Sequence, residues 1–390
     1  MNNKYSIMWL MVLLVGFTSC NKKQLSMQTV INEDGTCERV VSITCKGGSL
    51  VKDSLVSSDV VLGQFVDTAI LHFDDSWKAT WSPRHETQVN EFPISQKELK
   101  RLGAEMKKKG MEGTALDTIR LDLRRSFASV DEMCKNMPLK YNGKRLEVKG
   151  ELKKMFKWFY TDYTYTETYK SIGGEYETPV TKYLTEEETN TWFVGLPQST
   201  KDMKGNEVKV MLDQIEGKIC VWAVDNMMRD LAHVLLRHYD SIENPPMDKK
   251  TFASKCDSLV TYSIEHIYAV WEENNFAERM MEEFFKSNAY NEAMEMSPFH
   301  EEYETAVNEK YLAMSDQSNV DYALTLPGEI ISTGEGTLVD GVVHYKFSME
   351  KLVPHDYVIT ATSRVKNIWT YVVSVLIILV AVGSFIYKRR

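Results

Sequence analysis

The chain has 390 residues, of which 43% are apolar, and a formal net charge of −9 at neutral pH. This apolar fraction is ordinary for a folded globular protein and excludes global disorder. Without Lys4 and the terminal Lys388–Arg390, 42 of the 46 cations remain against 55 acids, and so acidic a surface argues against nucleic acid as a partner.

Residues 1–19 have the layout of a secretory signal peptide. Lys4 precedes an apolar run from Ile7 to Phe17 that is too short to span a bilayer. Cys20 directly follows Thr18-Ser19, which resembles the lipobox of bacterial lipoproteins, with Phe17 where that motif usually has leucine. The resemblance implies that Cys20 is acylated and becomes the new N-terminus. Cleavage without acylation is the alternative.

Residues 20–204 are predicted to form the β-rich N-terminal part of an α+β domain. Two β-rich runs within 27–46 flank Glu33-Asp34-Gly35, a hairpin signal. Farther along, Ser129 and Glu132 predict a capped short helix.

Five cysteines remain when Cys20 is set aside, so at least one of them is unpaired. Cys37 and Cys45 are expected on one strand, about 27 Å apart, which is too far for a disulfide. We expect buried thiols with at most one bridge, and which cysteines pair stays open. The five are Cys37, Cys45, Cys134, Cys220 and Cys256.

An unusually aromatic stretch, KKMFKWFYTDYTYTETYKS, covers residues 153–171. Interleaved threonines and aromatics are strong strand formers, and alternation loads both faces of a strand running from about 144 to 170. We therefore expect a central strand, packed on one side by helices and on the other by the sheet interior. A platform that stacks sugars or acyl chains is the alternative, and it would use Phe156, Trp158, Tyr160, Tyr163 and Tyr165.

From residue 185 the apolar period changes from two to near 3.6, which predicts helices. Residues 207–243 read as one long helix, broken if anywhere near Gly217 and ended by Pro245-Pro246. Residues 248–290 predict one or two more helices, and Ser297-Pro298 begins another. Residues 205–315 are therefore interpreted as a helical insertion.

His300 and Glu304 lie at i and i+4 of the last predicted helix, a spacing that can hold a metal ion. A zinc hydrolase would need further ligands and a general base, and the motif HExxH is absent from the sequence. Acidic residues in the first turn of a helix interact favourably with the helix dipole, which explains these residues without a metal. We therefore expect neither a metal nor another cofactor.

Residues 316–366 return to strands and are expected to complete an antiparallel sheet, with a turn at Val339-Asp340-Gly341. Residues 369–387 contain no charge and span about 28 Å as a helix, the thickness of a hydrocarbon core. Cations at 388–390 follow at once, which predicts a transmembrane helix with a cytoplasmic tail.

These ends together predict a protein of the bacterial inner membrane with its body in the periplasm. Few residues separate Cys20 from the first strand or the last strand from the span. We therefore expect both strands to approach the same membrane surface within one sheet, and the helical insertion to point away from the membrane.

The C-terminal strands contain Leu326-Pro327-Gly328-Glu329-Ile330, Asp340-Gly341, Tyr345, Asp356-Tyr357 and Ala361-Thr362-Ser363. With these residues the strands and tail resemble the C-terminal module of LppM-like bacterial lipoproteins, over about 60 residues plus the lipobox, with Tyr345 where that family often has tryptophan. That family pairs a lipobox with a small α+β domain and a C-terminal transmembrane helix. The whole chain also resembles uncharacterised envelope lipoproteins of the Bacteroidota. These resemblances imply an α+β architecture and an envelope location, and they supply no catalytic residues.

Nucleophile-elbow, phosphate-loop and dinucleotide-binding motifs are absent from the sequence. The leading hypothesis is a non-enzymatic binding or interaction module anchored in the envelope, with the membrane and an envelope protein or lipid as partners. A lipid or glycan binder with an apolar cavity between sheet and helices is the second hypothesis. An unrecognised hydrolase is the third.

Overall fold

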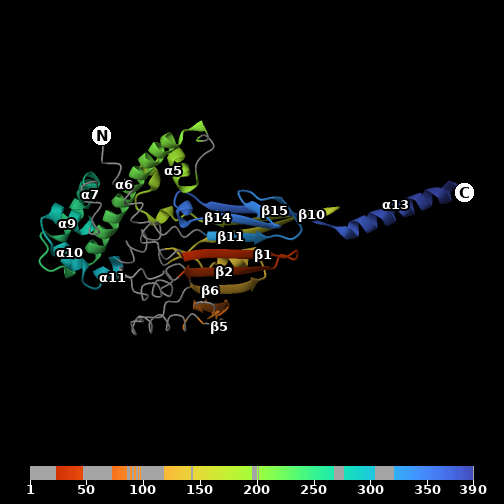
Figure 1. Ribbon diagram of the computed structural model, residues 1–390, viewed down its shortest axis with the longest axis horizontal. Helices are drawn as coiled ribbons and strands as arrows, with labels where there is room; N and C mark the ends of the chain where they lie inside the picture. The colour runs from red at the N-terminus through yellow and green to blue at the C-terminus, as the bar shows by residue number, and fades with distance from the viewer. Residues whose placement is uncertain are drawn as a thin grey trace.

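The computed structural model describes residues 23–46, 73–85, 88–89, 92–93, 95, 97, 118–141, 144–195, 200, 202–267, 276–303 and 320–389. Along its longest axis, helices α7 to α11 lie at one end, two β-sheets lie in the middle and α13 projects from the other end (Figure 1). The chain is an α+β protein, as the sequence predicts.

The larger sheet has nine strands, eight of them in the order β13-β14-β11-β1-β2-β6-β3-β4, with β5 paired to β3. Its pairs are antiparallel except for β1 and β11, which are parallel. That pair departs from the expected antiparallel sheet because β11 returns only after the chain has passed through the helices. The bounds are β1 Lys23–Ile31, β2 Cys37–Lys46, β3 Lys78–His85, β4 Gln88–Val89, β5 Phe92–Pro93, β6 Thr118–Phe127, β11 Val320–Thr325, β13 Thr337–Val339 and β14 Val342–Phe347.

The smaller sheet has the order β12-β15-β10-β9 and is antiparallel. Its bounds are β9 Val148–Lys157, β10 Tyr160–Tyr169, β12 Glu329–Ser332 and β15 Tyr357–Lys366. The aromatic stretch is therefore a hairpin, and the expectation of one central strand is wrong. Trp158 and Phe159 form the turn between β9 and β10.

The two sheets pack face to face, and alternate residues of the strands β1, β2, β6, β10, β11, β14 and β15 point into the shared core. Met27 on β1, Leu123 on β6 and Tyr165 on β10 are all buried there. Helix α4 (Val130–Lys135) closes one side against β9, and Ser129 caps it by accepting a hydrogen bond from the Glu132 N–H, as predicted. The inner face of β10 thus lies in the core between the sheets, as expected, but its outer face is only half-buried and the expected layer of helices does not pack on it within the described residues.

Gly328 lets the chain pass from the larger sheet to the smaller one between β11 and β12. Its φ is +80°, and a Cβ there would lie 2.2 Å from the Arg364 carbonyl oxygen. Glycine is the residue that tolerates both conditions. Within Leu326–Ile330, this position therefore has a backbone role.

β1 and β15 lie in different sheets, and β1 starts at the end of the body opposite to the end where β15 finishes. The expectation that both strands approach the same membrane surface within one sheet is therefore wrong. The turn after β1 lies near the hairpin tip, since the Lys154 ammonium donates a 2.7 Å hydrogen bond to the Glu33 carbonyl. β1 runs toward that turn, so its first residue, Lys23, lies about 27 Å away at the opposite end of the sheet from α13.

Helix α6 (Gly205–Arg237) joins the sheets to a helical module, defined here as Val224–Tyr303, which has its own apolar core. It is continuous through Gly217 and ends well before Pro245. Trp222 lies in the core of the sheets, whereas Val224 begins that of the module. The other helices are α5 Glu186–Phe193, α7 Lys249–Glu265, α9 Phe276–Phe285, α10 Ala289–Met294 and α11 Phe299–Tyr303.

Short elements complete the described chain. β7 (Lys140–Tyr141) pairs with β8 (Lys144–Arg145) as a two-stranded ribbon. The turn before β14 uses Asp340 and Gly341, whose φ values of 50° and 81° fit the predicted tight hairpin. The 3-10 turns lie at Gly173–Glu175, Val180–Lys182, Tyr239–Ser241 and Met349–Leu352.

Helix α13 (Ile368–Arg389) follows β15 after a single residue, Asn367, and projects away from the sheets (Figure 1). Among the described residues it is the one helix long and apolar enough to cross a membrane, and almost none of it is buried. The expected span 369–387 lies within it.

Candidate functional site

The junction between β15 and α13 is tied to the turn of the β9–β10 hairpin by Asn367. Its backbone N–H donates a 2.9 Å hydrogen bond to the Phe159 carbonyl, and its side-chain amide donates one of 2.8 Å to the Lys157 carbonyl. The Thr161 hydroxyl donates to the Asn367 side-chain oxygen at 3.0 Å. The Asn367 carbonyl also accepts from the Thr370 N–H in the first turn of α13. One residue therefore binds the hairpin and begins the helix.

Aromatic side chains of the hairpin pack against the first two turns of α13. Phe156 stacks on Trp369 with ring centroids 6.3 Å apart, and Phe159 meets Tyr371 at 4.9 Å. Trp158 lies edge-on to Trp369, and its indole N–H donates a 2.9 Å hydrogen bond to the Ser374 hydroxyl. The hairpin tip and the start of α13 thus form one aromatic cluster.

Cations surround this cluster on the outer face of the smaller sheet. The Arg364 guanidinium lies over the Tyr160 ring at 3.7 Å and forms a bidentate ion pair with Asp162. The hydrogen bond from Arg364 holds the pKa of Asp162 below its ordinary value. Lys157 and Lys366 are exposed in the row of residues nearest the tip, where each is paired with Tyr160.

The five residues of the predicted platform occupy three environments rather than one surface. Phe156 and Trp158 are exposed at the hairpin tip. Tyr160 lies under Arg364 on the outer face. Tyr163 and Tyr165 are buried between the sheets.

A buried ion pair between Arg39 on β2 and Glu167 on β10 lies in the middle of the core and was not predicted. The guanidinium donates to both carboxylate oxygens at 2.9 and 2.8 Å, and both side chains have zero exposure. Hydroxyls of Tyr165, Tyr322 and Tyr169 donate three more hydrogen bonds to Glu167. One sequence signal could have revealed this pair. Alternation along β2 and along β10 places the charged residues Arg39 and Glu167 on the inward faces of their strands.

Burial and neighbouring groups shift the pKa values of the side chains in this cluster. Burial by itself would raise the pKa of Glu167, but the Arg39 charge and the hydrogen bonds lower it. Burial and the Glu167 charge raise the pKa values of Tyr165 and Tyr322 well above the ordinary value. The cluster is enclosed by both sheets, so it joins them and offers no surface to a substrate.

Four cysteines are free thiols in the part of the chain that the structure describes with side chains. Burial raises the pKa values of Cys37, Cys220 and Cys256 to about 11 and that of Cys134 further. Thiols with such pKa values stay protonated and are poor nucleophiles. Cys45 belongs to β2, but its side chain lies outside the described residues, as do Cys20 and the signal sequence.

The metal candidate His300 is exposed on α11, and Glu304 lies outside the described residues. Glu302 of that helix instead accepts a 2.6 Å hydrogen bond from His238 and pairs with Arg237, which ties α11 to α6. Within the described ranges, no three histidine, cysteine or acidic side chains gather as metal ligands.

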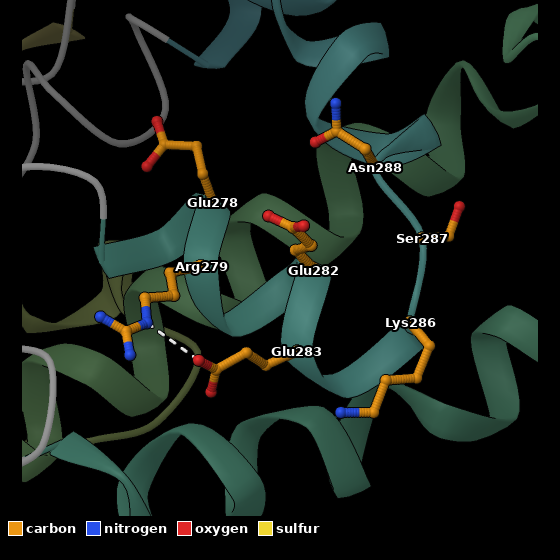
Figure 2. A pocket seen from close by; sticks show the side chains of 7 residues that line it. All are labelled: Glu278, Arg279, Glu282, Glu283, Lys286, Ser287 and Asn288. Carbon is orange, nitrogen blue, oxygen red and sulfur yellow. Dashed lines mark hydrogen bonds and ion pairs between the residues drawn. The ribbon is translucent and has the colours of Figure 1, made fainter.

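Two of the hollows on the surface of the described residues are open to solvent. One, of about 560 Å³, follows α9 and its C-terminal loop, where Glu278, Glu282 and Glu283 stand beside Arg279 and Lys286 (Figure 2). Arg279 is paired with Glu283. The other, of about 700 Å³, lies on the polar outer face of the larger sheet between charged residues such as Lys78, Asp122 and Lys346. Neither is the apolar cavity between sheet and helices that a lipid binder of the predicted kind needs.

No protein family, curated protein or solved structure shows significant similarity to this chain.

Proposed function

We propose that this protein is anchored in the bacterial inner membrane by α13 and holds its helical module in the periplasm as a non-enzymatic interaction module. The observation that carries the proposal is the position of α13 and the helical module at opposite ends of the long axis (Figure 1). In this layout the two sheets lie between the bilayer and the helical module, so the length of the sheets separates the module from the membrane.

Several properties of α13 support a transmembrane role. It has 22 residues, enough to cross a hydrocarbon core, and its apolar side chains are exposed along its length. Trp369, Tyr371 and Tyr387 lie near its ends, where interfacial aromatics are favoured, and Lys388 with Arg389 complete its last turn. The positive-inside rule assigns that cationic end to the cytoplasm.

The helical module supports the role of a partner-binding part. It has 16 acidic and 7 basic residues between Val224 and Tyr303. Such a surface is repelled by anionic lipid headgroups and attracts a basic protein surface. We infer a protein partner whose contact surface is basic.

Topology mapping tests this proposal. The full chain, expressed with a fluorescent protein fused after Arg390, should resist extraction by carbonate and fluoresce in the cytoplasm. External protease added to spheroplasts should digest the body and leave the fused tail. Release of the intact chain by carbonate, or protection of the body in spheroplasts, would contradict the proposal.

A further inference from the structure

We propose that the tip of the β9–β10 hairpin, residues 155–160, is a second membrane-binding element that lies in the outer interface of the bilayer crossed by α13. This inference rests on the proposed transmembrane role of α13. It assigns the hairpin tip to a phospholipid surface rather than to a protein or a soluble ligand.

The depth of the tip follows from its contact with α13. Ser374 lies five residues beyond Trp369, which is about 8 Å farther along the helix. The Trp158 indole reaches Ser374 with a 2.9 Å hydrogen bond. If Trp369 lies at the membrane surface, Trp158 lies below it, and the tip cannot stay in water while α13 spans the bilayer.

The exposed side chains of the tip suit that position. Phe156, Trp158 and Phe159 are each 43–57% exposed despite their contacts with α13, and Met155 beside them is 45% exposed. A contiguous apolar surface of this kind is costly in water and is favoured at a membrane interface. Two polar groups, the Trp158 indole N–H and the Ser374 hydroxyl, satisfy each other, as an apolar environment requires.

The charges nearest the tip fit the headgroup layer. Lys366 is exposed in the row next to the turn, and its long side chain can extend to lipid phosphates. Lys157 in the same row is also exposed, and its ammonium lies 3.7 Å from the Asp162 carboxylate. Asp162 and Glu329 lie two rows farther back, beside Arg364, and Asp162 is already paired with that arginine. The row that enters the interface first is therefore cationic.

Two contacts with one bilayer also fix the orientation of the body. α13 is joined to β15 by Asn367 alone, and Asn367 is hydrogen-bonded to the turn of the hairpin. Rotation about the junction would break these bonds and lift the aromatic tip out of the interface. The tip therefore holds the strands upright and the helical module away from the membrane.

Depth measurements on the full chain in phosphatidylcholine liposomes test the inference. Nitroxide labels at Phe159→Cys and at the control Lys149→Cys are compared for collision with oxygen and with a water-soluble nickel complex. Lys149 is exposed at the end of β9 far from the tip, about 27 Å from Lys157 at the other end of that strand. The parent chain, treated with the same reagent, gives the background from native cysteines.

We expect oxygen collisions to exceed nickel collisions severalfold at position 159, and the reverse at 149. Met155→Cys, which keeps every tip aromatic, should give an intermediate ratio, so the test survives if Phe159→Cys does not fold. Equal access of nickel at 155, 159 and 149, with the chain still incorporated, would overturn the inference and leave the transmembrane role intact. Failure of the full chain to incorporate would instead refute the transmembrane role.

Discussion

Arg39 and Glu167, 128 positions apart in sequence, form a fully buried bidentate ion pair that joins the two sheets. Each partner is also bound by neutral neighbours, since Thr29 accepts from Arg39 at 3.0 Å and tyrosine hydroxyls donate to Glu167. A pair of this kind stabilises one arrangement of the two sheets, because any slip of a strand leaves an unpaired charge in the core.

Breaking this pair from one side should be costly. Glu167→Gln or Arg39→Met is expected to lower the free energy of unfolding by about 3–5 kcal/mol, because the remaining partner is left buried and uncompensated. Urea unfolding of the detergent-solubilised full chain, followed by near-UV circular dichroism, measures this.

The double variant Arg39→Met with Glu167→Gln should lose much less than the sum of the single losses. Lys135→Met is the control, because it breaks an exposed pair with Asp131 and should change little. Additive losses in the double variant would contradict a coupled pair.

Glu350 should make the protein less stable as the pH rises through 6. Burial raises the pKa of Glu350 from its ordinary 4.5 to about 6. Because the folded pKa is the higher one, the stability from this group is fully present below pH 4.5 and is lost as the pH rises through about 6. The loss is about 2 kcal/mol.

Glu350→Gln should therefore be more stable than the parent at pH 7 and should remove this part of the pH dependence between pH 4.5 and 6. Glu167 acts in the opposite sense, since its lowered pKa makes its contribution disappear toward acid pH, and it is present in both proteins. Exposed Glu151→Gln is the matched control. Parallel stability curves for the parent and Glu350→Gln would rule the effect out.

Alanine substitutions at Gly328 and Gly341 distinguish the cost of a steric clash from the cost of backbone strain. Their φ values are +80° and +81°, but a Cβ at Gly328 would meet the Arg364 carbonyl, whereas one at Gly341 would meet nothing within 4 Å. Gly341→Ala should cost about 1–2 kcal/mol from the left-handed backbone alone. Gly328→Ala should cost clearly more or prevent folding, as thermal unfolding of both variants will measure. Equal midpoints would mean that the crossing between the sheets can relax.

Cys20 should be dispensable for membrane attachment. Cys20→Ala is expected to abolish incorporation of labelled fatty acid and to leave the protein in the membrane fraction, because α13 remains. In the same background, a chain ended after Asn367 should become extractable by carbonate, because it has lost α13 and keeps only the interfacial contact of the hairpin tip. A parent chain that never incorporates the label would show that the resemblance to a lipobox is misleading.

Local signals in the sequence determined several features correctly. The cap at Ser129, the hairpin at Asp340-Gly341 and the apolar length of α13 depend on interactions within a few residues, so the sequence alone predicts them. The α+β class follows from the change of apolar period near residue 185 for the same reason.

Features that depend on contacts between distant segments were decided only by the tertiary structure. An aromatic run looks the same whether it continues or turns, and the turn at Trp158 and Phe159 has no glycine or proline to mark it. What stabilises that turn is Asn367, more than 200 positions later.

The direction of β1 and the contact between Arg39 and Glu167 were also decided by contacts between segments that are far apart in the sequence. β1 pairs in parallel with β11, nearly 300 positions away, and this pairing sets its first residue at the end opposite α13. Strand pairing and charge pairing are interactions in space, and sequence separation gives no measure of them. Local propensity therefore determined the elements of this protein, and packing between the two sheets decided how its ends and its aromatic tip are arranged.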